Sequence, residues 1–282
     1  MTNMLKLPTV SIVTPSFNQA RYLESTIRSV LAQRDAIHEY FVFDGGSTDG
    51  SREIIQRYTT GIDFWQSERD GGQGDAIHKG LSKATGDILF WINSDDMIAP
   101  GAINRVRQAF AAHAKWDVLT GYSVFLDEHD TITKVNCIGP ESQFWLDMGI
   151  LHVCQQTCFF KRSLYERVGG IDTNLHCMLD TELWLRFFRA GATWGHLKNV
   201  LGGFRQHALM KGKTWGDEYA AEKKEVAARF PGFNAQRRGM SLGRLVYGAS
   251  KVIGYSSRRN RVASALEGQR LADCAPASLG LG

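Results

Sequence analysis

The 282-residue sequence lacks any apolar run that approaches the ~18 residues of a membrane span, so no transmembrane helix is expected. Residues 1–8 have no long apolar core, which predicts that no signal peptide is present. The five cysteines are an odd number, and Cys154 and Cys158 have no second pair with which to complete a zinc site. These absences predict a cytoplasmic protein with reduced thiols.

Several nucleotide-binding and hydrolase motifs are also absent. No Gly-x-x-x-x-Gly-Lys-Ser/Thr loop is present, which excludes a P-loop NTPase. No Gly-x-Gly-x-x-Gly follows the first predicted strand, and no Gly-x-Ser-x-Gly elbow occurs, so a dinucleotide fold and an α/β-hydrolase have no support. The net charge is +4, and there are no Lys/Arg-rich tracts of nuclear-signal type. Nucleic acid is therefore not an expected partner.

The sequence does contain alternating strands and helices over about its first hundred residues. Short runs of branched and aromatic residues predict strands, and apolar residues at helical spacing predict helices. The strands are expected at 10–14, 40–43, 64–68 and 88–92, and the helices at 22–31, 52–58 and 76–84. This order predicts a doubly wound α/β fold with a mostly parallel central sheet flanked by helices.

Two adjacent carboxylates, Asp95 and Asp96, come directly after the strand at 88–92. Ligands bind at the carboxyl ends of the strands in such sheets. Neighbouring carboxylates repel each other, and a divalent cation relieves the repulsion; hard oxygen ligands suit Mg²⁺ or Mn²⁺ bridging to substrate phosphates. The alternative is a polar turn in which one of the two caps the helix that begins after Pro100.

Polar loops follow the other predicted strands at 16–18 and 44–51, and a glycine-rich loop at 69–75 precedes a helix. Glycines in these loops let the backbone approach a ligand closely. If the strands are parallel, the loops gather at one edge of the sheet with residues 93–96. A simpler interpretation is that Asp44 and Asp49 form Asx turns and that Asp75 is a helix cap.

Four motifs in this order resemble glycosyltransferase family 2, whose members have the GT-A fold. They are Ser-Ile-Val-Thr-Pro-Ser-Phe-Asn (11–18), Asp-Gly-Gly-Ser-Thr-Asp-Gly-Ser (44–51), Ser-Glu-Arg-Asp-Gly-Gly-Gln-Gly-Asp-Ala-Ile-His-Lys-Gly (67–80) and Asn-Ser-Asp-Asp (93–96). The similarity extends to about residue 215. It implies an inverting transferase that uses a nucleotide-diphosphate sugar, in the first place a UDP-sugar, and a divalent metal, Mn²⁺ or Mg²⁺.

The resemblance also implies roles for individual residues. The nucleotide-binding positions are Thr14, Pro15, Phe17, Asn18, Asp44, Gly46, Asp75, Lys79, Ser94, Asp95 and Lys213. The metal-binding positions are Asp96, Asp95 and His207. This chain has Asn93 where many members of the family have a further Asp, and Asp96 is the favoured direct ligand.

The second half of the sequence is expected to bind the acceptor. A hairpin is predicted from 124–127 and 132–138, within a smaller acceptor-side sheet. By resemblance, Gln155 and Gln156 lie on the acceptor side; the alternative is a polar strand edge. The resemblance makes Asp180 the catalytic base, with Glu182 in reserve, and the alternative is an acidic first turn that caps a helix.

The resemblance divides the chain into a GT-A domain at 1–215 and a C-terminal helical basic extension at 216–282. The nucleotide-binding part covers about 8–115, and the acceptor-binding part covers about 116–215. Residues 235–261 carry seven Lys/Arg and no acidic residue. This stretch either contacts an anionic membrane surface or packs on the catalytic domain. Residues 273–282 are expected to be disordered.

The predicted function is transfer of a hexosyl or N-acetylhexosaminyl group to a saccharide or lipid-linked saccharide acceptor. Such an enzyme is expected in the cytoplasm, or peripherally at the inner face of the membrane. Two alternatives remain at this point. One is a non-catalytic sugar-nucleotide-binding protein, and the other is a nucleotidyltransferase on a related fold, although its N-terminal Gly-rich signature is missing.

Overall fold

The computed structural model describes residues 7–137, 141, 146, 151, 153–208, 210, 216–231 and 265–280. Its strands are β1 Val10–Ser16, β2 Glu39–Asp44, β3 Phe64–Ser67, β4 Ile88–Trp91, β5 Met97–Ile98, β6 Val118–Leu126, β7 Ile132–Asn136, β8 Phe159–Lys161 and β9 Trp194–Arg205. Its α-helices are α1 Ala20–Leu31, α2 Ser51–Arg57, α3 Gln73–Lys83, α4 Ala102–Ala112, α6 Arg162–Arg167, α7 Leu179–Arg189 and α9 Gly216–Arg229. The short 3-10 helices are η1 Arg34–Ala36, η2 Gln155–Thr157, η5 Leu271–Asp273 and η6 Pro276–Leu279.

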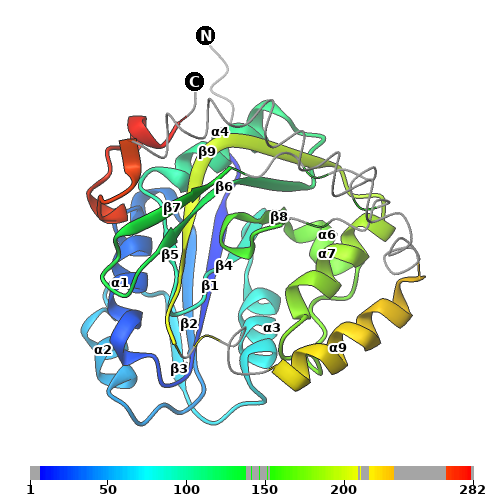
Figure 1. Cartoon of the computed structure of the whole chain (residues 1–282), viewed down its shortest axis with the longest axis horizontal. Coiled ribbons are helices and arrows are strands. Elements are labelled where there is room, and N and C mark those ends of the chain that lie inside the picture. Colours follow the sequence, from blue (N-terminus) through cyan, green and yellow to red (C-terminus); the bar gives the residue numbers. More distant parts are fainter. Residues whose placement is uncertain are drawn as a thin grey trace.

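All the described strands belong to one hydrogen-bonded sheet in the order β3-β2-β1-β4-β8-β6-β9-β5, with β7 beside β6 (Figure 1). The strands β1 to β4 are parallel, as the alternation of strands and helices predicts. β8 is antiparallel to both of its neighbours, and β6 and β9 are parallel to each other. The predicted acceptor-side hairpin is confirmed as β6 and β7, and it extends the same sheet.

Both faces of the sheet are covered by helices, because alternate residues of each central strand pack on opposite sides. In β4, Ile88 and Phe90 face the core under α1, α2 and α4, whereas Leu89 and Trp91 face the core under α3, α6 and α7. All four side chains are buried. The unbroken apolar run of this strand therefore reflects burial on two sides, as the sequence indicates.

The register of the parallel strands brings their carboxyl ends to one edge. Ser16 at the end of β1 pairs with Asp44 at the end of β2, and Asp44 pairs with Ser67 of β3. The loops that follow these strands therefore start side by side. The predicted gathering of the polar loops is confirmed, and this edge is where the cavity described below opens.

The C-terminal residues 265–280 pack against the sheet. Leu266, Leu271 and Leu279 are buried in the same core as β6 and β7, and Thr131 and Asn199 form isolated bridges to this segment. The expectation of disorder is therefore wrong for residues 273–280, because apolar side chains spaced along the segment bury there. The basic stretch 235–261 lies outside the described residues. Within the described part of the chain, no helix is long and apolar enough to cross a membrane.

Candidate active site

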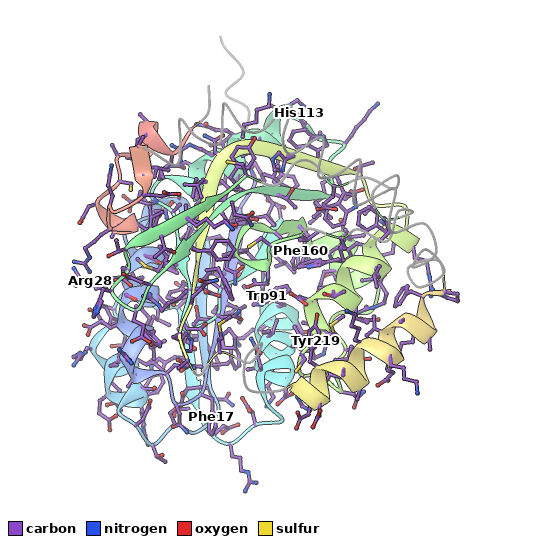
Figure 2. The ribbon with its side chains drawn as sticks, in the orientation of Figure 1. Phe17, Arg28, Trp91, His113, Phe160 and Tyr219 are labelled. Carbon is purple, nitrogen blue, oxygen red and sulfur yellow. The ribbon has the colours of Figure 1, made fainter. Side chains whose placement is uncertain are left out.

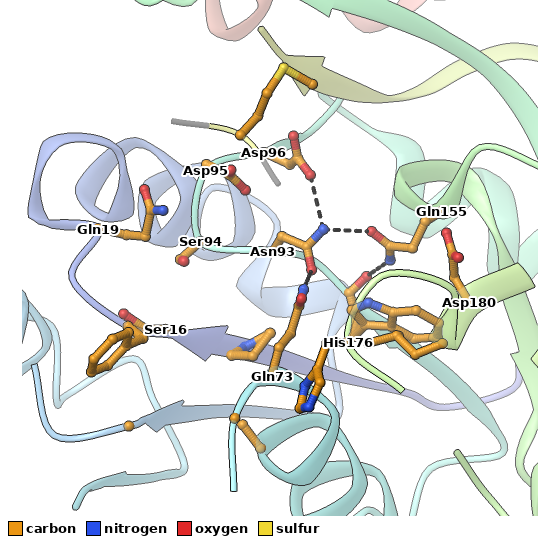
Figure 3. Close-up of a pocket in the computed structure, with 18 of the residues that line it drawn as sticks. Ser16, Gln19, Gln73, Asn93, Ser94, Asp95, Asp96, Gln155, His176 and Asp180 are labelled. Carbon is orange, nitrogen blue, oxygen red and sulfur yellow. Dashed lines mark hydrogen bonds between the residues drawn. The ribbon is translucent and has the colours of Figure 1, made fainter. Parts of the chain in front are cut away.

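A cavity of about 980 Å³ opens at the carboxyl ends of the parallel strands (Figure 3). Its wall comes from the loops after β1, β2, β3 and β4, from η2 and the residues before it, from the start of α7, and from α9. Seven of the predicted site residues line it: Pro15, Phe17, Gly46, Ser94, Asp95, Asp96 and Asp180. The structure thus brings to one cavity some members of each predicted group, nucleotide-binding, metal-binding and catalytic.

Asp96 lies at the back of this cavity and is only 1% exposed. Its carboxylate accepts hydrogen bonds from the backbone N–H of Arg205 at 2.9 Å, from Gln156 Nε2 at 2.7 Å and from Asn93 Nδ2 at 3.3 Å. Burial, followed by the charge of Asp95, raises the pKa of Asp96 well above its usual value. Both carboxylate oxygens are therefore held by protein donors.

Asn93 connects this carboxylate to the rest of the cavity wall (Figure 3). Its amide oxygen accepts from Gln73 Nε2 at 2.7 Å, and its amide nitrogen also donates to Gln155 Oε1 at 3.2 Å. Gln155 Nε2 in turn donates to the carbonyl of Trp91 at 2.6 Å. An amide can donate and accept at once, whereas a carboxylate only accepts. This explains why Asn suits position 93 in this chain.

Asp95 points toward His207 instead, with 3.0 Å between Asp95 Oδ2 and His207 Nε2. The Asp95 side chain is 22% exposed, and that of His207 is 2% exposed. Arg205 holds the turn from behind, because its Nε donates to the backbone carbonyl of Asp95 at 2.7 Å. Its guanidinium also pairs with Asp130 and donates to Ser25 Oγ at 2.9 Å. Of the two carboxylates in the cavity wall, Asp95 is thus the more exposed one.

Neither carboxylate caps the helix that follows. α4 begins at Ala102 after Gly101, whose φ is +72°, and no side chain caps its N-terminus. The backbone carbonyls of Ser94 and Asp96 accept from Thr26 Oγ1 at 3.0 and 2.7 Å. The capping interpretation of the acidic pair is therefore wrong.

Phe17, Gly46 and Asp70 form one end of the cavity. Phe17 is 60% exposed. Gly46 has φ of +80°, and a Cβ there would lie 3.1 Å from the backbone nitrogen of Arg69, so only glycine fits this close approach. Asp70 accepts from the backbone N–H of Gly72 at 2.8 Å, and burial raises its pKa. An exposed aromatic ring beside a carboxylate is suited to a flat, polar heterocycle.

Several predicted nucleotide-binding residues lie behind this wall and support its loops. Asp44 is 2% exposed, and it accepts from the backbone and hydroxyl of Ser47 at 2.9 and 2.5 Å and from Ser67 Oγ at 2.7 Å. Asn18 accepts from the backbone N–H of Thr48 at 3.0 Å. Thr14 is buried against Tyr40. For Asp44, and for Asp49 with Ser51, the local-turn interpretation describes what the side chain does.

Asp75 and Lys79 pair with each other at 2.8 Å on α3, and neither lines the cavity. Asp75, in the first turn of the helix, also accepts a hydrogen bond of 3.0 Å from the backbone N–H of Gly71. The hydrogen bond from Lys79 lowers the pKa of Asp75. Their place near the phosphates stays a prediction. Lys213 lies outside the described residues.

Asp180 lies in the first turn of α7 and lines the other end of the cavity. Its carboxylate accepts from its neighbour Thr181, and Met178, at the N-cap position, makes no side-chain cap. Burial raises the pKa of Asp180. Glu182, in contrast, is bound through both oxygens by Arg186 at 2.7 to 2.9 Å and does not line the cavity. This geometry is at odds with a base role for Glu182.

Sequence reasoning missed some of the residues that line the cavity. Asp70 and Gln73 lie in the glycine-rich loop and at the start of the helix after it, so their position was a usable signal. Tyr219 comes from α9 and gave no signal, because its place depends on how that helix packs. Gln155 and Gln156 do line the cavity, but their amides hold Asn93, Asp96 and the carbonyl of Trp91.

Among the described residues, no group of three or more His, Cys, Asp and Glu side chains is arranged to hold a metal ion. Asp95 and His207 carry side chains of the metal-ligating kind, a carboxylate and an imidazole, and a hydrogen bond of 3.0 Å joins their Oδ2 and Nε2 atoms. His207 Nε2 binds a metal ion only in the tautomer without a proton there, so this hydrogen bond would have to break first. The remaining ligands would have to come from outside these side chains, such as phosphate oxygens and water.

Comparison with known proteins was consistent with the geometry. Residues 11–169 match the sequence model of glycosyl transferase family 2. An uncharacterized glycosyltransferase of Mycobacterium tuberculosis is 34% identical over 185 residues, which covers 65% of this chain and 70% of that protein. The putative teichuronic acid biosynthesis glycosyltransferase TuaG of Bacillus subtilis is 28% identical over 221 residues, covering 77% of this chain and 85% of TuaG.

Two solved structures have a similar fold. S. aureus TarS 1-349, in complex with UDP-GlcNAc, has a TM-score of 0.60 at 16% identity, covering 78% of this chain and 66% of that one. The mannosyltransferase PcManGT from Pyrobaculum calidifontis, in complex with GDP-Man and Mn²⁺, has a TM-score of 0.59 at 19% identity, covering 92% of this chain and 79% of that one. These likenesses confirm the predicted GT-A fold.

Proposed function

The chain belongs to glycosyl transferase family 2, and on that premise we propose that this glycosyltransferase moves a sugar from a UDP-sugar donor to a saccharide or lipid-linked saccharide, with inversion at the anomeric carbon. One observation carries the proposal. A single cavity holds an exposed aromatic ring with a carboxylate at one end, an acidic pair in its wall, and a carboxylate with a raised pKa at the other end. A nucleotide, a diphosphate and an acceptor hydroxyl would meet these groups in that order.

At the first end, Phe17 offers its ring to the base, and base–aromatic stacking is worth about 1–3 kcal/mol. Asp70 offers a carboxylate to a ring N–H, which gives a charge-assisted hydrogen bond. Asp44, Asn18 and Thr14 support the loops of this end from behind. The two solved neighbours hold a uridine and a guanosine diphosphate sugar, respectively, so the nucleotide is the part of the donor that most needs a test.

We assign the metal to Asp95, because it lines the cavity and is the more exposed carboxylate of the pair. His207, which does not line the cavity, would join it by exchanging its hydrogen bond to Asp95 for the ion. Asp96 then positions the turn instead of binding the ion directly, which revises the preference for Asp96. An imidazole together with a carboxylate favours Mn²⁺ over Mg²⁺. When bound, the metal would neutralise charge on the leaving diphosphate. Lys213 remains a proposed phosphate contact.

Asp180 is the proposed general base. An acceptor hydroxyl is a poor nucleophile, and a positioned carboxylate takes its proton as the oxygen attacks the anomeric carbon. The bond from that carbon to the diphosphate oxygen breaks in the same displacement, which inverts the configuration. Burial raises the pKa of Asp180 and so makes it a stronger base than an exposed Asp.

The name of TuaG refers to teichuronic acid biosynthesis, a polysaccharide pathway. By analogy, we propose a polysaccharide or glycoconjugate of the cell envelope as the product. An enzyme of this kind would work in the cytoplasm, and a lipid-linked acceptor would bring it to the inner face of the membrane. The basic stretch 235–261 is the proposed contact in that case.

The test is a calorimetric titration of the protein with UDP and, separately, with GDP, each with and without Mn²⁺. We expect UDP to bind, and Mn²⁺ to increase its affinity at least tenfold. UDP-glucose, UDP-galactose and UDP-N-acetylglucosamine are then incubated with the enzyme, and slow release of UDP is measured. Binding of GDP but not of UDP would indicate a GDP-sugar as the donor. Failure of both nucleotides to bind would refute the proposal.

A further inference from the structure

Two large apolar side chains are exposed in the described part of the chain, Phe17 at 60% and Tyr219 at 41%. Both line the same cavity, and Figure 2 shows them on different elements, the loop after β1 and the inner side of α9. Burying such a side chain is worth about 1.5–3 kcal/mol, so an exposed one in a cavity indicates a ligand. Phe17 is accounted for by the nucleotide base, whereas Tyr219 has no role in the proposal so far.

Tyr219 is held in place although α9 is a polar helix. Three residues further on, Glu222 accepts from the backbone N–H groups of His176, Cys177 and Met178 at 2.7, 2.8 and 2.9 Å. These three N–H groups directly precede α7. The carboxylate of α9 thereby satisfies donors at the N-terminus of the helix that carries Asp180.

The far end of α9 is also fixed. Arg229 pairs with Asp172 at 2.6 Å, and the guanidinium of Arg189 on α7 lies 4.3 Å from the ring centre of Phe230. Val226 is fully buried between the two helices and the rest of the core. The helix that carries Tyr219 is therefore fixed against α7, and a binding surface on a fixed element loses less entropy when a ligand binds.

Tyr219 and Asp180 are neighbours in the cavity. Both line it, and the pKa of Tyr219 is raised by burial first and then by the charges of Asp180 and Cys177. A tyrosine phenol is protonated at neutral pH, so this one can donate a hydrogen bond. Lys223 Nζ lies 5.9 Å from the ring centre, at the limit of a cation–π contact. The ring thus combines an apolar face with a polar tip beside the proposed base.

We propose that Tyr219 is the platform on which a sugar ring of the acceptor stacks, so that one of its hydroxyls faces Asp180. The C–H face of a pyranose is apolar and its edge carries hydroxyls, which matches an aromatic face with a phenol at its tip. This inference rests on the proposed function, because it uses Asp180 as the base. It adds that the acceptor end recognises a saccharide ring through α9.

The experiment compares two exposed aromatics of one cavity. Saturation-transfer NMR measures the binding of the methyl glycosides of glucose, galactose, mannose, rhamnose and N-acetylglucosamine to the enzyme with UDP and Mn²⁺. Calorimetry measures UDP affinity in the same samples. The variants are Tyr219→Ala, Tyr219→Phe and Phe17→Ala, with Lys224→Ala as a control for an exposed change on α9.

We expect Tyr219→Ala to weaken the binding of the best glycoside about fivefold to tenfold, and Tyr219→Phe to retain most of it. Phe17→Ala should weaken UDP and not the glycoside, and Lys224→Ala should change neither. Equal glycoside binding by wild type and Tyr219→Ala would overturn the platform, as would the absence of any bound glycoside in the wild type. An effect of Tyr219→Ala on UDP affinity alone would make the residue a donor contact and overturn the platform too. Failure of wild-type UDP binding is a separate result, which would refute the proposed function itself.

Discussion

The carboxylate of Asp96 accepts the backbone N–H of Arg205 at 2.9 Å, across 109 positions of sequence. This bond joins the turn after β4 to the end of β9, and Arg205 Nε completes the connection by donating to the carbonyl of Asp95. The side chains of two adjacent aspartates thereby have different partners. Asp96 is turned inward and fixes the turn, and Asp95 is turned toward His207 and the cavity.

We therefore expect Asp95→Asn to remove the metal-dependent part of UDP affinity, a loss of about tenfold or more in Mn²⁺. Asp96→Asn should instead lower the free energy of unfolding by about 1–3 kcal/mol, because its amide nitrogen would face the donors of Gln156, Asn93 or Arg205. Calorimetry and urea unfolding of both variants distinguish the two effects. If Asp96→Asn alone removes the response to Mn²⁺, Asp96 is the direct ligand and our assignment is wrong.

The sequence predicted the parallel part of the fold well, because burial on both faces leaves an unmistakable apolar run such as the one in β4. It also predicted that the acidic pair lies at the cavity. The sequence could not tell apart the surroundings of Asp95 and Asp96, because Gln156, which holds Asp96, lies 60 residues away, and Arg205 and His207 lie more than a hundred residues away.

Other expectations depended on residues that lie closer together in the sequence. The spacing of Glu182 and Arg186 is that of an i,i+4 ion pair, so the structural role of Glu182 was readable as an alternative to catalysis. The place of Tyr219 was not readable, because it is set by how α9 docks on α7. The expectation of disorder was wrong for residues 273–280, because their apolar side chains are spaced too irregularly to indicate a helix or a strand.

Asp180 and Glu182 give a matched comparison two residues apart on one helix. Asp180→Asn should lower kcat by about 10²–10⁴ and leave UDP affinity unchanged, because only proton transfer is lost. Glu182→Gln should change kcat less than tenfold and lower the free energy of unfolding by about 2 kcal/mol, since Arg186 loses its carboxylate. Steady-state kinetics and urea unfolding check both. A large kcat loss in Glu182→Gln with unchanged stability would reverse the assignment.

The raised pKa of Asp180 predicts the acidic side of the pH–rate profile. A base must be deprotonated, so kcat falls as the pH drops through the pKa of this carboxyl group. Because burial raises that pKa, the fall should occur at a higher pH than the ~3.9 of an ordinary Asp. The measurement is kcat against pH in the wild type. The residual activity of Asp180→Asn should not show this fall at low pH. If the fall persists in the variant, another group is responsible for it.

His196 provides a prediction on stability. Burial, followed by the charge of Lys198, lowers the pKa of His196 to about 4, and its Nδ1 lies 3.0 Å from Thr120 Oγ1. The unfolded chain binds a proton at this residue below about pH 6.5, while the folded chain does not until about pH 4. Stability is therefore lost as pH falls through this window, by about 2 kcal/mol between pH 7 and pH 5.

The test compares urea unfolding of wild type and His196→Asn at both pH values. The asparagine keeps an atom near the position of Nδ1 and does not titrate, so its loss of stability on acidification should be smaller by about 2 kcal/mol. Other titrating groups, such as Asp96, contribute equally to both proteins and cancel. Equal losses in the two proteins would show that the pKa of His196 is the same in the folded and the unfolded chain.

Gly202 on β9 packs closely against η2, whose two glutamines bind Asn93 and Asp96. A Cβ at this position would lie 2.2 Å from the backbone oxygen of Gln156, which has no room to move without shifting η2. Since Gln156 holds Asp96 and Gln155 holds Asn93, Gly202→Ala should disturb the turn at residues 93–96 without touching it. We expect a loss of about 1–3 kcal/mol in stability together with weaker UDP binding in Mn²⁺.

Gly216 is the matched control for that change, because no atom of the described residues, apart from its own chain neighbours and the nearby backbone of its own helix, lies within 4 Å of its added Cβ. Gly216→Ala should keep UDP affinity and leave stability equal or slightly higher, since Ala favours a helix over Gly by about 1 kcal/mol. Calorimetry and urea unfolding of the pair separate a local clash from a general effect of adding a methyl group. If Gly202→Ala loses stability and yet binds UDP and Mn²⁺ like the wild type, the amides of η2 support the fold only, and the turn at Asp95 and Asp96 keeps its geometry without them.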